Sequence, residues 1–394
     1  MIPRISLPKG FRASGVNSGV RRYRPDLGVV VSETPCVAAG VFTRNSLKAA
    51  PVLYCAALLP SSDIRAIVVN SGQANAATGA EGIQDNLVLA TKTAETLGLA
   101  QKQVLVSSTG VIGVRPLLEK LLPGLVPAAK GLSEIVNNFA LSIMTTDLVP
   151  KVSARDVKLS GGMIRIVGAA KGSGMIHPNM GTMLGFIVTD AGTEKTWLDS
   201  TLKAIADESF NMISVDGETS TNDTVLVLAN GASGVHATNE SDRELLKKGL
   251  REVAVDLAMS IARDGEGASK LITVHVRRAP SLEQAREAAR MITTSPLIKS
   301  AIHGEDPNWG RILARLGQAG IEARCFDALR VELQGVRVFD AGKPVAFDRA
   351  AAREKLKGDA VVIDVDLGQM TEHMATAWGC DLTKRYVEIN TEYS

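Results

Sequence analysis

Short apolar runs that end in polar, glycine-containing turns recur along this chain, and they constrain its fold more than any other feature. Examples are "RAIVVNSG" at residues 65–72, "QVLVSSTGVIG" at 103–113 and "DTVLVLANG" at 223–231. Runs of this length bounded by turn residues are typical of buried β-strands. Segments with helical periodicity, such as 82–99 and 195–213, lie between them. A chain that alternates in this way is expected to fold as a mixed α and β protein.

Local signals place further elements. Capping boxes at Ser241–Glu244 and Ser281–Gln284 predict two helices that begin there. Residues 149–174 have the pattern of a β-hairpin that runs into a glycine-rich loop. From about residue 320 the pattern changes to short strands around one helix. This change indicates a smaller C-terminal subdomain, which we place at about 280–394.

The composition is that of an ordinary globular protein, and it argues against several kinds of partner. The 394 residues suffice for two or three domains. The net charge is +2 without a basic tract, so neither nucleic acid nor an anionic membrane is expected as a partner. No apolar run approaches the length of a membrane span, about 18 residues, and the N-terminus lacks a signal-peptide core. Four widely spaced cysteines are expected to be reduced thiols in a cytoplasmic protein.

Metal and nucleotide motifs are missing from the sequence. The five histidines show no H-x-x-x-H or H-E-x-x-H spacing, so no metal site is expected. The glycine loops "KGSGM" at 171–175 and "DGEGASK" at 264–270 match neither the Walker pattern nor the dinucleotide fingerprint. Each loop alone is typical of a plain turn. We therefore expect no bound cofactor.

Thr182 stands where a glycine-rich loop becomes a buried strand, in "KGSGMIHPNMGTMLGFIVTD" at 171–190. In one interpretation it starts the strand and packs its methyl group into the core. In the other it is a nucleophile whose own freed α-amine, with a pKa of about 7.7 to 8.0, acts as general base. That role requires cleavage of the Gly181–Thr182 bond. Because Gly181 has no Cβ, it tolerates the strained backbone from which the threonine Oγ attacks its carbonyl.

Such chemistry also needs an oxyanion hole, and the sequence offers one candidate. Thr109 and Gly110 stand at an expected break after a buried strand. A hydroxyl and a backbone N–H there would point at one oxygen, and each such donor contributes roughly 3 kcal/mol to transition-state stabilisation. The alternative is that these two residues form an ordinary turn.

Four dense polar clusters lie at the ends of expected strands or helices. They are "NSGQANAATG" (70–79), "MTTD" (144–147), "DGETSTNDT" (216–224) and "HGEDPNWGR" (303–311). Loops at element ends are where binding residues gather. Together with Lys171, the clusters indicate a site for a small zwitterion, with carboxylates and amides for its amino group and a lysine for its carboxylate.

Taken together, these clusters resemble the ornithine acetyltransferase family, the bifunctional acetyltransferases of arginine biosynthesis. The likeness extends in order over nearly the whole chain and includes "GVFTRNSLKAAPV" (40–52), "SPLIKSAIHGEDPNWGR" (295–311) and "YVEINTEYS" (386–394). The resemblance implies an α+β fold, a layered α/β/β/α sandwich with an N-terminal-nucleophile-like site and a smaller α/β C-terminal subdomain. It also implies self-cleavage into an α chain, 1–181, and a β chain, 182–394, with two of each in the assembly.

The resemblance assigns roles to single residues. It implies Thr182 as nucleophile, with Thr109 and Gly110 as oxyanion hole. The substrate-binding residues that it implies are Thr145, Lys171, Thr182, Glu266 and Asn390. The implied reaction is ping-pong: acetyl passes from N-acetylornithine to the threonine hydroxyl and then to glutamate. Acetyl-CoA stays open as a second acetyl donor.

Two positions depart from the family pattern. Gly181 precedes the nucleophile where the family usually has alanine, which bears on the rate of self-cleavage. Ser394 stands four residues after Asn390, whereas the family usually has Ser or Thr five residues after that asparagine, at a substrate contact.

Two other functions fit the same residues. An amidase or aminopeptidase with an N-terminal nucleophile would cleave itself but pass the acyl group to water. A non-catalytic small-molecule binder of the same fold would remain a single uncut chain.

Overall fold

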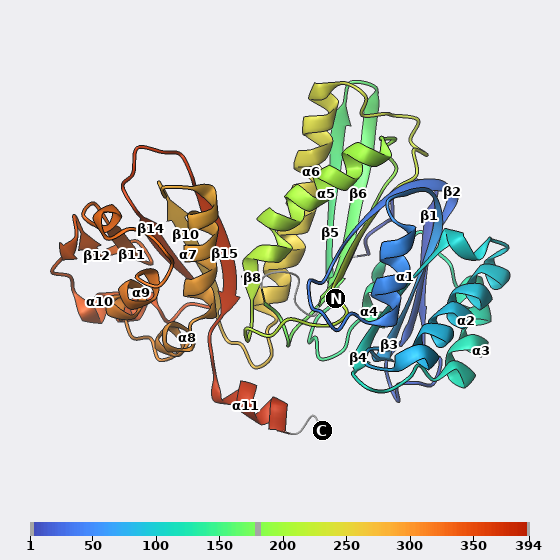
Figure 1. Ribbon diagram of the computed structural model, residues 1–394, viewed down its shortest axis with the longest axis horizontal. Coiled ribbons are helices and arrows are strands. Elements are labelled where there is room, and N and C mark those ends of the chain that lie inside the picture. Colours follow the sequence, from blue (N-terminus) through green and yellow to red (C-terminus); the bar gives the residue numbers. More distant parts are fainter. Residues whose placement is uncertain (1–3, 178–182, 392–394) are drawn as a thin grey trace. The chain divides into compact units, whose positions relative to one another are not determined.

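The computed structural model describes residues 4–177 and 183–391 (Figure 1). The chain forms two compact units, and the first comprises Met1–Gly172, Asn179–Asp207 and Thr219–Leu257. The second comprises Ser173–Pro178, Glu208–Glu218 and Ala258–Ser394. Each unit contains one β-sheet with helices, so the prediction of a mixed α and β fold is confirmed.

An eight-stranded sheet forms the centre of the first unit. Its order is β4-β3-β2-β9-β7-β6-β5, and β1 pairs with β2. The strands are β1 (Phe11–Val16), β2 (Leu27–Phe42), β3 (Ser61–Gln73), β4 (Val104–Val111), β5 (Lys151–Leu159), β6 (Gly162–Lys171), β7 (Leu184–Thr189) and β9 (Thr224–Ala229). The long strand β2 joins two halves of the sheet, because residues 27–31 pair with β3 whereas 37–42 pair with β9. The register shifts between Val31 and Cys36, and such an irregularity lets the sheet bend into a second layer.

The main hydrophobic core lies between the two halves of this sheet. Ile67 of β3 belongs to it together with Phe186 of β7 and Leu228 of β9. The neighbouring Val68 belongs to a different core on the outer face, as expected for successive strand residues that point to opposite sides. That outer core also contains residues of α2 (Gly79–Leu97) and α3 (Leu118–Lys130).

Helices cover the second half of the sheet as well. The helix α6 (Glu240–Arg263) approaches β6 so closely that a Cβ on Gly168 would lie 2.7 Å from the side chains of Val253 and Leu257. The helix α5 (Lys195–Glu208) crosses α6 in the view of Figure 1. With α2 and α3 outside the other half, these layers form the expected α/β/β/α sandwich. The shorter helices of this unit are α1 (Ala50–Leu58), α4 (Asn137–Ser142) and the 3₁₀ turn η1 (Gln101–Gln103).

Two helix boundaries differ from the sequence prediction. The helix α6 begins at Glu240, before the predicted cap at Ser241, because Asn239 Oδ1 accepts the backbone N–H of Asp242 and so caps the first turn. The helix α5 ends at Glu208, short of 213, because the buried residues that follow form a 3₁₀ turn and a short strand.

The second unit is built on a seven-stranded sheet of order β13-β12-β11-β14-β10-β15-β8. Its strands are β8 (Ile213–Ser214), β10 (Leu271–Arg277), β11 (Arg330–Leu333), β12 (Val336–Asp340), β13 (Lys343–Pro344), β14 (Ala360–Asp366) and β15 (Ala375–Cys380). Its helices are α7 (Leu282–Thr294), α8 (Pro296–His303), α9 (Trp309–Leu316), α10 (Arg349–Lys355), α11 (Lys384–Thr391) and the 3₁₀ turns η2 (Phe210–Met212) and η3 (Ala323–Phe326). The predicted cap of α7 is confirmed, since the Ser281 side chain accepts the N–H of Gln284.

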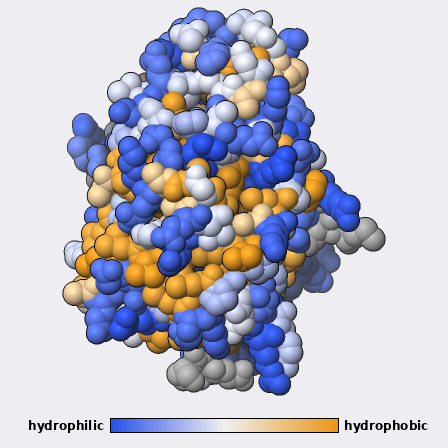
Figure 2. Space-filling view, turned by 90° about the vertical axis from the view of Figure 1, so that its right-hand side faces the viewer, coloured by the Kyte–Doolittle hydropathy of each residue, from blue (hydrophilic) through white to orange (hydrophobic). Residues whose placement is uncertain are grey.

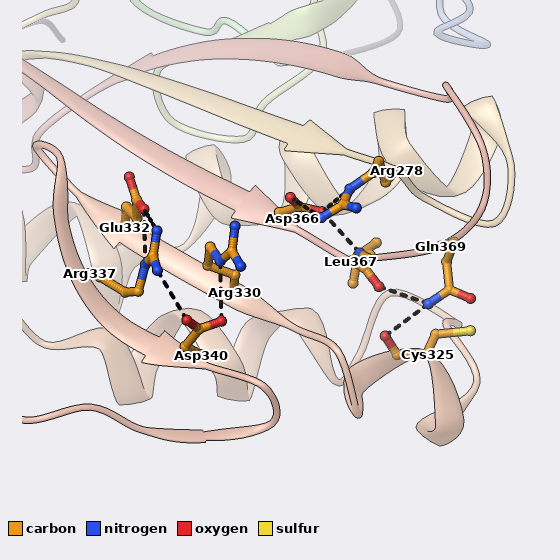
Figure 3. A network of polar contacts seen from close by, with 10 residues as sticks. Arg278, Cys325, Arg330, Glu332, Arg337, Asp340, Asp366, Leu367 and Gln369 are labelled. Carbon is orange, nitrogen blue, oxygen red and sulfur yellow. Dashed lines mark hydrogen bonds and ion pairs between the residues drawn. The ribbon is translucent and has the colours of Figure 1, made fainter.

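Ion pairs link the outer strands of the second sheet (Figure 3). The Asp340 carboxylate on β12 accepts from Arg330 of β11 at 3.1 Å and from Arg337 at 3.1 Å. Arg278 donates to both carboxylate oxygens of Asp366 at the end of β14. In the described part of the chain, no helix is long and apolar enough to cross a membrane.

Candidate active site

Thr109 and Gly110 lie near the end of β4, where the sequence predicted that the strand would break. The break does not occur: β4 continues to Val111 and pairs in parallel with β3 throughout. Gly110 is instead distorted within the strand, with φ +129°, directly beside Gly72 of β3. A Cβ on Gly110 would lie 2.3 Å from the backbone of Gly72, so the two strands approach here because neither residue has a side chain.

Lys171 reaches Thr109 from the end of β6. Its side chain is almost completely buried, and its Nζ lies 3.2 Å from Oγ1 of Thr109, to which it donates a hydrogen bond. Because this oxygen accepts from an ammonium group, the hydroxyl hydrogen of Thr109 remains available for donation to another oxygen. The structure thus brings together two residues that stand 62 positions apart in the chain.

Asp147 is fully buried and organises the same end of the sheet. Its carboxylate accepts from Lys151 Nζ at 2.6 Å, from the backbone N–H of Gly172 at 2.7 Å and from that of Thr145 at 2.9 Å. Burial by itself pushes the pKa of this carboxyl up. The charges of Lys151 and Lys171 and the bond from Gly172 outweigh burial, however, and they lower the pKa to about 2.

The backbone of Thr145 is held on both sides by charged side chains. Its N–H donates to Asp147, and its carbonyl oxygen accepts from the guanidinium of Arg21 at 3.1 Å. Arg24 donates to the carbonyl oxygen of Asp147 itself at 3.3 Å. The predicted substrate-binding threonine therefore lies on a loop whose path is fixed by ionic hydrogen bonds.

The predicted nucleophile Thr182 and the preceding Gly181 lie outside the described residues, but Met183 is described. Its N–H donates to Oδ1 of Asp223 at 3.0 Å, and its carbonyl oxygen accepts from the N–H of Thr224 at 3.2 Å. The strand β7 begins at the next residue. The chain that follows Thr182 is thus fixed from its first residue onward.

Glu266 and Asn390 belong to the second unit, whereas Thr109 and Lys171 belong to the first. There the structure brings them together: Asn390 Nδ2 donates to Glu266 Oε2 at 3.0 Å. Asp216 lies in the same unit and accepts the backbone N–H groups of Met175 and Ile176. Burial, and to a smaller extent the charge of Glu266, raises the pKa of the Asp216 carboxyl despite these bonds.

Comparison with known proteins assigns the chain to a family. Residues 12–394 match the ArgJ family. The chain belongs to the ArgJ family. The arginine biosynthesis bifunctional protein ArgJ of Thermotoga neapolitana is 47% identical over 397 residues, which cover 98% of this chain and 99% of that protein. The protein of the same name from Symbiobacterium thermophilum is 45% identical over 397 residues, covering 99% and 98%.

A solved structure supports the same assignment. The crystal structure of arginine biosynthesis bifunctional protein argJ from Bacillus halodurans is 40% identical, with a TM-score of 0.50. It covers 52% of this chain and 96% of its own. The resemblance to the acetyltransferases of arginine biosynthesis, which rested on scattered polar clusters, is thereby confirmed at the level of the ArgJ family.

Sequence reasoning missed three buried polar residues that contact the predicted site residues or their chain neighbours. Asp147 was noted only as part of the cluster "MTTD", and Asn222 and Asp223 only as part of "STNDT". Asn222 Nδ2 donates to the carbonyl oxygen of Ser108 at 2.9 Å, directly before Thr109. The sequence feature that could have predicted them is the high density of Asp and Asn beside a strand end, because the side chains of such residues often bind backbone groups there.

Proposed function

We propose that this chain is an acyltransferase that moves acetyl from N2-acetylornithine to glutamate after it has cleaved itself between Gly181 and Thr182. Membership of the ArgJ family and the names of relatives that match over nearly their full length support this function. The observation that carries it is the contact of the buried Lys171 with Thr109, which leaves the threonine hydroxyl a donor beside Gly110.

Self-cleavage comes first in the proposed sequence. The Oγ of Thr182 attacks the Gly181 carbonyl carbon, and the acyl group moves from the threonine nitrogen to its oxygen while the hydroxyl proton passes to the leaving nitrogen. Water then hydrolyses the ester. The products are a chain that ends in the Gly181 carboxylate and a chain that begins with the free amine of Thr182.

Acetyl transfer uses the new N-terminus. The amine of Thr182 takes the proton of its own Oγ, and this oxygen attacks the acetyl carbonyl of N2-acetylornithine. Thr109 Oγ1–H and the Gly110 N–H stabilise the oxyanion of the tetrahedral intermediate. Ornithine leaves with the proton, and the amine of glutamate then takes the acetyl group from the threonine ester by the same steps in reverse. Acetyl-CoA would enter as an alternative donor at the first step.

The remaining residues hold the substrates. Lys171 and Asn390 bind substrate carboxylates, because an ammonium and an amide both donate hydrogen bonds to such groups. Thr145 and Glu266 bind the amino groups and other polar groups of the amino acid. No metal and no cofactor takes part in this scheme.

We further propose that two α and two β chains assemble in the cytoplasm. The side of the molecule drawn in Figure 2 carries apolar residues gathered over much of its surface, and such patches mark protein contacts. Val111, Ile112 and Val114, which end or follow β4, are also exposed apolar residues. All four cysteines are buried free thiols, which suits a reducing compartment.

A denaturing gel and a transfer assay test the proposal. The purified wild-type protein should show two fragments with the masses of 1–181 and 182–394, and Thr182→Ala should remain one chain without transferase activity. Wild-type protein should move acetyl from N2-acetylornithine to glutamate. Release of free acetate without acetylglutamate would identify an amidase instead, and an uncut wild-type chain would refute the proposed mechanism. Glutamate with acetyl-CoA alone tests the second donor.

A further inference from the structure

The loop before β9 contacts two segments that the proposed chemistry needs. Asn222 Nδ2 donates to the carbonyl oxygens of Ser108 and Ala74, so it binds the ends of β4 and β3. The next residue, Asp223, accepts the N–H of Met183. Two adjacent side chains therefore hold the residue before the predicted oxyanion donor and the residue after the predicted nucleophile.

Asp223 is an unusual choice for holding a backbone amide. Its side chain is completely buried, and only one of its oxygens, Oδ1, bonds to Met183. Its other oxygen, Oδ2, has no hydrogen-bonding partner among the described residues. Burial raises the pKa of this carboxyl well above its usual range, more than the bond from Met183, the neighbouring Thr43 hydroxyl and the charge of Lys171 lower it. The neutral form of this carboxyl is therefore favoured over the ionised form more than in an exposed aspartate.

The hold on Met183 is two-sided. While Asp223 fixes its N–H, the N–H of Thr224 fixes its carbonyl oxygen, and β7 continues directly into parallel pairing with β9. Because a peptide group is planar, a hydrogen bond that fixes the Met183 N–H also restrains the orientation of the peptide bond between Thr182 and Met183. Attack of a hydroxyl on the preceding carbonyl depends on such restraint, because a misplacement of about 1 Å can cost ~10²-fold in rate.

We propose that Asp223 is a positioning residue for self-cleavage between Gly181 and Thr182. It acts through Met183 and takes no part in bond making. This inference rests on the proposed function, and it adds a residue that neither the sequence motifs nor the resemblance assigned.

The other end of β7 provides a matched control. Asp190 follows the last residue of that strand, is also buried, and accepts the backbone N–H of Arg165 at 2.8 Å and that of Lys9 at 3.2 Å. It is thus a carboxyl beside the same strand, at the end away from residue 182, that holds backbone amides of β6 and of the segment before β1. Loss of Asp190 should weaken the strand without touching the cleavage junction.

The experiment follows cleavage of freshly made precursor. Full-length wild type and the variants Asp223→Asn, Asp223→Leu, Asp190→Asn and Asp190→Leu are made in a short cell-free pulse, and fragments 1–181 and 182–394 are followed on a denaturing gel. Asn keeps an acceptor oxygen for the Met183 N–H, so Asp223→Asn should cleave within about threefold of wild type. Leu keeps the branched shape but cannot accept the N–H, so Asp223→Leu should cleave at least about tenfold more slowly. Both Asp190 variants should cleave at the wild-type rate.

Each outcome decides the inference. Thermal melting of each uncut precursor in a Thr182→Ala background shows that the variant folds, and Asp223→Ala replaces Asp223→Leu if the latter does not. Normal cleavage by Asp223→Leu, or equal slowing by Asp190→Leu, would overturn the positioning role while wild-type cleavage still supports the proposed function. Failure of wild type to cleave would instead remove the proposed function itself.

Discussion

The Nζ of Lys171 lies 3.2 Å from Oγ1 of Thr109, and the buried carboxylate of Asp147 accepts from the amide of Gly172, next to that lysine. The Lys171 ammonium, the Thr109 hydroxyl and the Asp147 carboxylate thus belong to one buried polar network at the ends of β4 and β6. In such a network each group fixes the orientation of the next, and removal of one leaves another unpaired.

Thr109→Ala should lower kcat by about 10²- to 10³-fold, because it removes one donor to the proposed oxyanion. Since the donor acts mainly in the transition state, kcat/KM should fall by a similar factor. Steady-state acetyl transfer from N2-acetylornithine to glutamate measures both constants. Thr109→Ser, which keeps the hydroxyl, is the control and should retain most of the activity. Equal losses in the two variants would contradict the role of the hydroxyl.

Gly110→Ala should destabilise the first unit by more than about 2 kcal/mol and abolish transfer. The added Cβ would lie 2.3 Å from backbone atoms of Gly72, and the residue would also have to keep φ +129°. The matched control is Gly113→Ala, where φ is +81° but no atom lies within 4 Å of the added Cβ. That variant should lose only about 1 kcal/mol. Urea unfolding of both variants gives the comparison, and similar losses would argue against the close approach of β3 and β4.

Many strands could be predicted from the sequence because apolar periodicity and turn residues are local signals, whereas the α/β/β/α layers were expected only from the resemblance to the family. The cap of α7 at Ser281 was predicted correctly, whereas that of α6 was not, since Asn239 competes with Ser241 as a cap and no local rule ranks the two. The prediction that the strand breaks at Gly110 was also wrong, because no local rule shows what lies beside this residue in the sheet. Only the pairing with Gly72 shows that a strand can pass through this residue with its backbone distorted.

The polar network around the site was less predictable than the fold. The contact of Lys171 with Thr109 and that of Asp223 with Met183 each join residues that are far apart in the chain. Local rules say that Asp147 and Asp223 satisfy backbone groups, but they do not say which groups, or that the pKa of one carboxyl is lowered and that of the other raised. That difference depends on the lysines that the fold places beside Asp147.

Asp147→Asn should cost about 3 to 5 kcal/mol of stability at pH 7, because it removes the buried carboxylate to which the Lys151 ammonium donates at 2.6 Å. The pKa of Asp147 is lowered to about 2 in the folded protein, against about 3.9 in an unfolded chain. Its contribution is therefore present above about pH 4 and is lost as the pH falls through about 2. Thermal melts from pH 7 to pH 2 should show the difference between wild type and Asp147→Asn shrinking at the acid end. A difference that stays constant with pH would contradict the ionised state of Asp147.

Asp223→Asn should show the opposite pH dependence. Burial raises the folded-state pKa of Asp223 well above that of an unfolded aspartate, so between these two pKa values unfolding releases a proton that the native state retains. The stability that this carboxyl contributes is fully present below about pH 4 and is lost as the pH rises through its folded pKa. Asparagine does not ionise, so Asp223→Asn should gain stability relative to wild type between pH 4 and pH 8. Melting temperatures of both proteins in a Thr182→Ala background, which keeps each chain uncut, measure this gain. Asp190→Asn should not reproduce it, and a wild-type protein that becomes relatively more stable over this range would show that Asp223 is ionised in the folded state.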